Sequence, residues 1–209
     1  MSEEELLKER ILSAAFDRFR TDGFARVSID DIASSLVMSK KTFYKFFASK
    51  DDLIEQLVDR LLADVKAHVE RIVSSDQTFV AKLSALLSYL GSLPAHAGLP
   101  MLNDLQRHAP HLWKRVEQFR LQRIPDIFSR LLKQGIREGH VRPDLHQRIF
   151  LLSYMAAVQL IMQPSVLANE SFSAREAISG IMELFFKGAL TDRGRKQLAK
   201  VQIHPTLTL

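Results

Sequence analysis

The sequence VSIDDIASSLVMSKKTFYKFFASK, residues 27–50, predicts two short helices joined by a tight turn. Ser28 and Ser39 each stand before a helical stretch, in the N-cap position where a hydroxyl accepts a hydrogen bond from a backbone N–H. The second helix is basic and aromatic, because four lysines and no acid lie between Ser39 and Lys50. A short basic helix that rests on a small apolar cluster suits the major groove of DNA. A solvated basic surface helix is the alternative.

The side chains of this stretch suggest how it would meet DNA. Helix starts present unpaired N–H groups and the positive end of the helix dipole, so Ser28 and Ser39 can each hold a phosphate. Lysine donates to guanine O6 and N7, and the methyl group of Thr42 can contact thymine. Tyr44 and Lys50 are better placed for backbone phosphates. The predicted DNA-binding residues are Ser28, Ser39, Lys40, Lys41, Thr42, Tyr44, Lys45 and Lys50.

Residues 10–57 resemble the N-terminal DNA-binding domain of the TetR family of bacterial transcriptional regulators. The run SKKTFYKFFASK, residues 39–50, carries most of the resemblance. Further matching residues are Ile11, Ala14, Phe19, Gly23, Ile32, Ala33 and Leu53. The resemblance implies that the eight residues named above occupy DNA-contact positions of the family. It implies core positions for Phe43 and Phe47.

Three residues depart from the family pattern. Val37 stands in the turn, where the family often has glycine, so the turn must avoid positive φ or carry strain. Lys41 adds a charged arm where the family often has a small residue. Phe46 replaces a Tyr or His that would offer a polar tip to phosphate. We therefore expect an unusual operator.

Composition sets the broad class of the protein. The chain has 209 residues, 46% of them apolar and 25% charged, which is typical of a globular protein with a sizeable core. The net charge of +5 modestly favours polyanionic partners. The absence of cysteine fits a reducing cytoplasm. The most apolar run, residues 149–162, is shorter than the ~18–20 residues that span a bilayer, so we expect no membrane partner.

Helical periodicity runs through almost the whole chain, and strand signals are absent. We therefore predict an all-α protein of about nine helices. A helix-turn-helix DNA-binding domain is expected over residues 1–50. A helical ligand-binding and dimerisation domain is expected over residues 51–190, with a loop at 94–100 and a kink or restart at Pro125. A flexible basic tail is expected over residues 191–209.

The last two predicted helices suggest a dimer. Residues 149–162 are apolar nearly all round, and a helix of this kind must be buried on every face. Two chains could pair these helices as a four-helix bundle, which resembles the dimer interface of the family. An internal core helix is the alternative. The predicted interface residues are Ile149, Leu152, Met155, Ile178, Met182 and Phe185.

Large apolar side chains with a few polar tips would suit a bulky, mostly hydrophobic ligand. The candidate pocket residues are Phe79, Tyr89, Met101, Leu105, Trp113, Phe119, Phe128, Tyr154 and Gln159. Ordinary core packing is the alternative for each of them. His108 and His111 have a spacing that could share a metal, but Pro110 interrupts the helix and no acid cluster joins them. We predict no metal and no cofactor.

The sequence thus predicts a homodimeric transcriptional repressor that binds a palindromic operator and is released by a small-molecule effector. The effector would favour a different tilt of the helix that begins at Lys50. The motifs of hydrolases, phosphate-binding loops and dinucleotide sites are absent, so an enzyme is not predicted. An architectural DNA-binding protein without sequence preference is a third interpretation.

Overall fold

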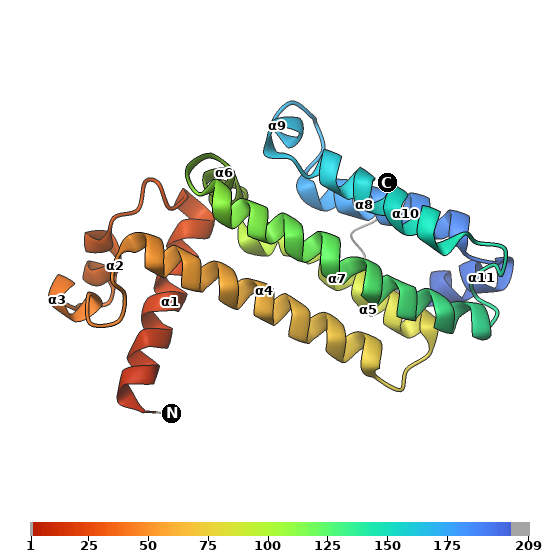
Figure 1. The fold of residues 1–209 in the computed structure, drawn as a ribbon, viewed down its shortest axis with the longest axis horizontal. Coiled ribbons are helices and arrows are strands. Elements are labelled where there is room, and N and C mark those ends of the chain that lie inside the picture. The colour runs from red at the N-terminus through yellow and green to blue at the C-terminus, as the bar shows by residue number, and fades with distance from the viewer. Residues whose placement is uncertain (1, 202–209) are drawn as a thin grey trace. The chain divides into compact units, whose positions relative to one another are not determined.

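The computed structural model describes residues 2–201, without the side chains of Pro94, Ala95, Ile124 and Pro164. Within that range the chain is helical, and its only β-bridge joins Val141 to Leu190. The elements are α1 (Glu3–Asp22), α2 (Ile29–Ser35), α3 (Lys40–Phe43), α4 (Lys50–Ser74), α5 (Phe79–Ala97), α6 (Leu99–His108), α7 (Pro110–Arg137), α8 (Gln147–Ile161), α9 (Pro164–Leu167), α10 (Ala174–Ala189) and α11 (Asp192–Lys200) (Figure 1). The predicted all-α class is confirmed.

The nine predicted helices are present, and α9 and α11 are additional. The predicted loop at 94–100 is wrong, because α5 continues to Ala97 and only Gly98 separates it from α6. The expected restart at Pro125 is also absent, since α7 runs through this residue. The predicted tail over 191–209 contains α11, whose start is capped by the Thr191 hydroxyl. The rest of that tail, residues 202–209, lies outside the described residues.

The chain forms two compact units. The first unit contains residues 1–64 and 95–116, and the second contains residues 65–94 and 117–209. The helices α4, α5 and α7 each contribute residues to both units. The sequence predicted a boundary near residue 50, whereas the units divide α4 after Asp64. Consequently α6, which the sequence assigned to the ligand-binding domain, belongs to the unit of α1–α3.

Aromatic residues organise the core of the first unit. Phe43 and Phe47 are fully buried, with ring centroids 5.4 Å apart. Phe19 of α1 is also fully buried, and it meets Phe24 edge-on at 6.0 Å. Lys45 lies between these two phenylalanines, in the stretch of residues 39–50 that we name the recognition segment, and it is exposed. The core thus fixes which side of this segment faces outward.

Ion pairs join α4 to its neighbours in the first unit. Arg115 of α7 donates to Glu55 and Asp59, with an N–O distance of 2.7 Å to each carboxylate. Arg60 pairs with Glu9 of α1. The fork of the guanidinium suits two acids one helical turn apart, so Arg115 fixes the rotation of α4 about its own axis relative to α7.

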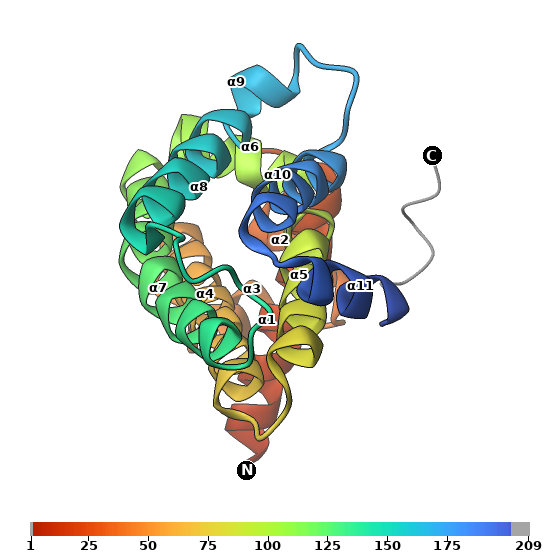
Figure 2. The same cartoon turned by 90° about the vertical axis from the view of Figure 1, so that its right-hand side faces the viewer.

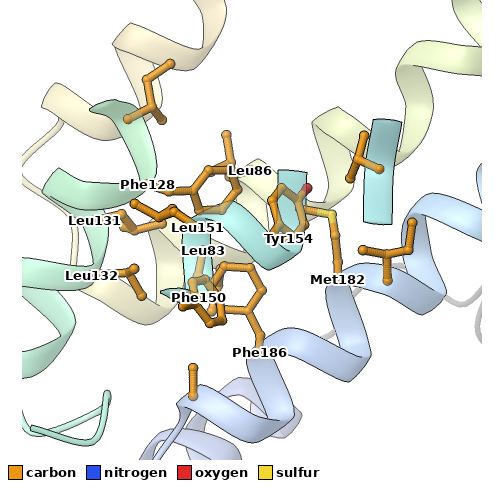
Figure 3. Packing of buried hydrophobic residues seen from close by; sticks show 14 of the residues in the cluster. Leu83, Leu86, Phe128, Leu131, Leu132, Phe150, Leu151, Tyr154, Met182 and Phe186 are labelled. Carbon is orange, nitrogen blue, oxygen red and sulfur yellow. The ribbon is translucent and has the colours of Figure 1, made fainter. Parts of the chain in front are cut away.

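The second unit has a larger hydrophobic core, which also contains several aromatic rings (Figure 3). The ring of Phe128 lies 5.2 Å from Tyr154 and 5.7 Å from Phe186, measured between centroids. Phe150 meets Phe186 edge-on at 5.6 Å. Helices α8 and α10 lie side by side in both views of the fold (Figures 1 and 2). This helix pair has one face on the core and leaves another face outward.

Candidate nucleic-acid interface

The first helix of the candidate interface, α2, begins with a capping box. The Ser28 hydroxyl accepts from the N–H of Asp31 at 3.1 Å, and the Asp31 carboxylate accepts from the N–H of Ser28 at 2.8 Å. The Ser28 hydroxyl also donates to that carboxylate, and these bonds hold the pKa of Asp31 below its usual range. The start of α2 therefore already carries a negative charge of its own.

The turn between α2 and α3 is a Schellman motif with valine in the position that glycine usually takes. The N–H of Met38 donates to Ala33 O at 3.0 Å, and the N–H of Val37 donates to Ser34 O at 3.1 Å. Val37 has φ +54° and is 96% exposed. A β-branched residue is strained in this left-handed conformation. Of the two outcomes that the sequence left open for this turn, the structure shows positive φ with strain.

The recognition segment begins at Ser39, whose hydroxyl accepts from the N–H of Thr42 at 3.1 Å. The hydroxyls of Ser39 and Thr42 are themselves 2.9 Å apart. Regular α-helix ends at Phe43, earlier than the sequence predicted, and the next turn tightens to i→i+3 bonds such as Phe46 N–H to Phe43 O at 3.0 Å. No acid lies in the first turn of α3, in contrast to α2.

The lysines of this segment have different environments. Lys40 pairs with Asp30 of α2 at 2.6 Å, which raises the pKa of Lys40. Lys41 and Lys45 are exposed and have no ion-pair partner among residues 2–201. Lys50, the first residue of α4, is half-buried, and burial lowers its pKa. Two lysines are thus fully available to a polyanion, and one already has an acidic partner.

Two aromatic residues complete the segment. Tyr44 is 51% exposed and meets the buried Phe43 edge-on, with centroids 5.5 Å apart. Phe46 is half-buried against the core of the first unit. The phenol of Tyr44 is therefore presented outward from a fixed ring, whereas Phe46 contributes to packing. The eight predicted residues lie in the segment that runs from the start of α2 to the start of α4, and Asp30 is a participant that the sequence did not reveal.

The predicted pocket residues divide between the two cores. Met101, Leu105 and Trp113 are buried in the first unit. Phe79, Tyr89, Phe128 and Tyr154 pack in the core of the second, where burial raises the pKa of the Tyr154 phenol. Phe119 is half-buried in α7, and Gln159 of α8 is exposed. The nine predicted residues are therefore divided between the two units, and neither unit contains all of them.

A small hollow opens in the second unit between α7 and α8. Its lining residues are Glu117, Arg120, Leu121, Met155, Val158 and Gln159. Of these, the sequence had singled out Gln159 and Met155 as candidates to line a cavity. Arg120 is half-buried, and burial lowers the pKa of its guanidinium. No sequence signal marks Arg120, because α7 carries many basic residues at similar spacings.

The predicted dimer residues also divide into two groups. Met155, Ile178 and Met182 are buried within the second unit, and Phe185 is half-buried. The three buried residues therefore contribute to the core of this unit. Ile149 and Leu152 are 59% and 53% exposed. Two further leucines, which the sequence pattern did not single out, are exposed on the same helix pair, Leu160 by 60% and Leu184 by 74%.

The exposed residues of α8 and α10 follow helical spacing. Ile149, Leu152, Ala156 and Leu160 of α8 lie three or four residues apart, so they share one face. On α10, Leu184 stands between Gly180 and Gly188, and a Cβ placed on either glycine would meet no atom within 4 Å. We name these seven residues the α8–α10 face.

His108 and His111 are both exposed, and His108 lies 3.9 Å from Asp104. Within the described part of the chain, no group of three or more His, Cys, Asp or Glu side chains could hold a metal ion. In the same range, every helix is too short or too polar to cross a membrane.

Comparisons with known proteins agree with this geometry. Residues 11–57 match the family described as bacterial regulatory proteins, tetR family. The chain is 25% identical over 190 residues to the uncharacterized HTH-type transcriptional regulator YvaF of Bacillus subtilis, covering 89% of this chain and 97% of that protein. It is 28% identical over 140 residues to the HTH-type transcriptional repressor KstR2 of Mycobacterium tuberculosis, covering 65% of this chain and 69% of KstR2.

Solved structures share the fold. The structure of the ketosteroid transcriptional regulator KstR2 of Mycobacterium tuberculosis superposes with a TM-score of 0.58 at 22% identity, over 89% of this chain and 96% of that one. A transcriptional regulator from Cytophaga hutchinsonii superposes with a TM-score of 0.70 at 19% identity, over 88% and 98%. The relatives and the fold are those of transcriptional regulators rather than enzymes. Residues 11–57 thus match the TetR family of bacterial regulatory proteins, and along most of its length the chain is similar to transcriptional regulators.

Proposed function

We propose that this regulator is a cytoplasmic repressor that binds a palindromic operator as a homodimer and is released by a largely hydrophobic small molecule. The observation that carries the DNA-binding part is the outward side of the recognition segment. Lys41 and Lys45 are exposed and without an acidic partner in the described chain, beside the phenol of Tyr44 and the acid-free start of α3. Cations and hydrogen-bond donors of this kind contact phosphates and the major-groove edges of bases.

The burial pattern of α3 supports a role for this helix in recognising the DNA sequence. Phe43 buries one side of α3 and Phe47 follows it into the core, whereas Lys40 and Lys41 of α3 are exposed. Ser39, Thr42 and Lys41 occupy the first turn, which is the part of a recognition helix that reaches base edges. Lys50 is half-buried, so its side chain can reach fewer positions than an exposed lysine. Its proposed contact is therefore with a phosphate close to the start of α4.

The α8–α10 face supports the homodimer. Four large apolar side chains on this face are between 53% and 74% exposed, more apolar surface than a lone helix pair usually leaves in water. The open space at Gly180 and Gly188 would allow the helices of a second copy to approach closely. A two-fold dimer presents two copies of α3 to the two half-sites of a palindrome.

We propose that the effector site opens at the hollow beside α7 in the second unit, which is small and would have to widen to admit a bulky ligand. Leu121, Met155 and Val158 give it an apolar wall, and Arg120 and Gln159 add polar groups. KstR2, a relative over 65% of this chain, is described as a ketosteroid regulator, which is consistent with a bulky hydrophobic effector here. A ligand that prefers a more open arrangement would shift the population of α4 and α7 orientations, and DNA affinity would change with it.

Selection from random double-stranded DNA tests this proposal. We expect a palindromic sequence to be enriched, and its affinity to fall steeply with salt. Lys45→Ala should lower the slope of log affinity against log salt by about 0.9 for each phosphate that is no longer neutralised, or about 1.8 for a dimer. Lys133→Ala, which removes an exposed lysine of the second unit, is the matched control and should leave the slope unchanged.

The architectural alternative predicts a different outcome of the same selection. A protein of that class would bind every duplex about equally, so no sequence would be enriched. Enrichment of a non-palindromic sequence would support sequence-specific DNA binding but contradict binding as a two-fold dimer.

A further inference from the structure

The helix α6 lies in the first unit, where it packs against α1. Gly98, which precedes α6, has φ +78°, and a Cβ at this residue would lie 2.1 Å from the carbonyl oxygen of Arg20. Such a distance is far below any van der Waals contact, so the backbone of residue 98 rests directly on the last turn of α1. Only glycine fits, because both the positive φ and the close approach exclude a side chain.

One carboxylate of α6 closes the turn that follows α1. Asp104 accepts a hydrogen bond from the backbone N–H of Ala25, with an Oδ2–N distance of 2.7 Å. Gly23 ends α1 with φ +81°, and a Cβ there would come within 2.5 Å of the same oxygen. The Asp104 side chain is 16% exposed, whereas Ala25 is exposed, so this charged hydrogen bond lies at the edge of the packed contact between α1 and α6. Bonds of this type are stronger than those between neutral exposed groups.

The turn that Asp104 holds leads directly to the DNA-binding segment. Ser28, three residues after Ala25, starts α2. Asp30 in the first turn of α2 pairs with Lys40 of α3 at 2.6 Å. A short series of contacts therefore runs from α6 through the α1–α2 turn to the first residue of α3. A shift of α6 against α1 would therefore move Asp104, the residue at which this series of contacts begins.

The chain itself connects α6 to the second unit at both ends. Residues 95–116 enter the first unit at the end of α5 and leave it within α7. Glu117 and Arg120, which line the hollow of the second unit, follow Val116 on the same helix. The segment that contains α6 is thus continuous in sequence with the part of α7 that lines the hollow.

We propose that Asp104 is a positioning residue through which α6 sets the α1–α2 turn and, with it, the recognition helix on DNA. This inference rests on the proposed DNA-binding function. The required group is the acceptor oxygen that faces Ala25, rather than the negative charge that Asp104 places near Lys50 and His108.

Two substitutions separate the acceptor from the charge. Asp104→Ala removes both, whereas Asp104→Asn removes the charge and keeps an oxygen that can accept from Ala25. Arg107→Ala, on the exposed side of α6, is the control on the same helix. Amide hydrogen exchange at Ala25 reports the bond itself. Affinity for the DNA selected by the wild-type protein, measured over a range of salt, reports its consequence.

We expect Asp104→Ala to accelerate exchange at Ala25 and to weaken binding of the selected DNA about tenfold or more, which corresponds to the loss of one charged hydrogen bond. The salt slope should stay that of the wild type, because every lysine that meets a phosphate is still present. Asp104→Asn should recover exchange and affinity to within about threefold of wild type, which is well under the effect of a hydrogen bond. Arg107→Ala should behave as wild type.

Wild-type affinity in Asp104→Ala would overturn the proposal, as would an Asp104→Asn protein that binds as weakly as Asp104→Ala. If the wild-type protein selects no sequence, the proposed function fails, and Ala25 exchange alone decides the positioning role. Faster exchange in Asp104→Ala and wild-type exchange in Asp104→Asn would then support that role, and equal exchange in all proteins would overturn it.

Discussion

The recognition segment and the α8–α10 face are both outward surfaces, but they differ in how their exposure arises. In the recognition segment, Lys41 and Lys45 are exposed and Phe43 and Phe47 are buried, so residue type and orientation agree at these positions. On α8, apolar residues occur on every side, and Leu151 is buried whereas Leu152 is exposed. A polar surface is therefore recognisable from residue type alone, whereas an exposed apolar surface is recognised only once the packing of the helices is known.

The largest expected effect follows from the apolar surface. Leu152→Glu combined with Leu160→Glu should convert the dimer to monomers. A two-fold dimer would lose four buried leucines, at about 1.5–3 kcal/mol each, or at least about 6 kcal/mol in total. Light scattering at micromolar concentration measures the change in mass.

Leu6→Glu is the control for this dimer experiment, because Leu6 is a 47% exposed leucine of α1 in the other unit. It should leave the mass unchanged. A wild-type mass for the double variant would show that the α8–α10 face is not the interface.

The next effect concerns the buried side of the recognition segment. Phe47→Ala should destabilise the protein by about 3–5 kcal/mol, since it removes a fully buried aromatic ring. Phe46→Ala should cost clearly less, because Phe46 is only half-buried. Urea denaturation at one fixed protein concentration measures both. Equal losses would mean that the neighbouring phenylalanines do not have opposite orientations.

A smaller effect is expected at the turn between α2 and α3. Val37→Gly should stabilise the protein by about 0.5–1 kcal/mol, because relief of left-handed strain exceeds the entropy cost of glycine. Val37 is 96% exposed, so no burial is lost. Val37→Ala retains a Cβ at positive φ and should gain less. If thermal denaturation shows that glycine destabilises, the left-handed conformation of Val37 in the structure is not the one in solution.

The smallest effect tests the acid beside the recognition helix. Asp30→Asn should strengthen binding to random-sequence DNA a few-fold, because it removes one negative charge and releases Lys40. Asp76→Asn, at an acid of the second unit, should have no effect. Fluorescence anisotropy at low salt measures the change. Weaker binding in Asp30→Asn would indicate that Asp30 instead holds Lys40 in its DNA-binding orientation.

Much of the fold could be predicted from the sequence, because the caps and periods that define it are local. Ser28 and Ser39 cap helices as predicted, and Phe43 and Phe47 are buried. The α5–α6 junction could not be predicted in the same way. Two prolines suggested a loop, but a single glycine that rests on the backbone of α1 makes the turn.

The candidate sites depended more on packing. The packing of α8 against α10 decides which apolar residues of α8 face outward. The local sequence pattern does not predict this orientation. The same holds for Asp104, an ordinary acid of an amphipathic helix until its bond to the N–H of Ala25 is seen. Long-range pairs of this kind join residues that are 79 positions apart, so neither periodicity nor capping rules reveal them.

The spacing of half-sites tests the central claim most directly, namely that two copies of α3 read one DNA site from a fixed dimer. The affinity of the wild-type protein for its selected palindrome should be compared with that for a variant carrying about five extra base pairs, half a helical turn, between the half-sites. We predict that affinity falls toward the nonspecific level, a loss of about a thousandfold. Equal affinity for the two DNAs would contradict the claim.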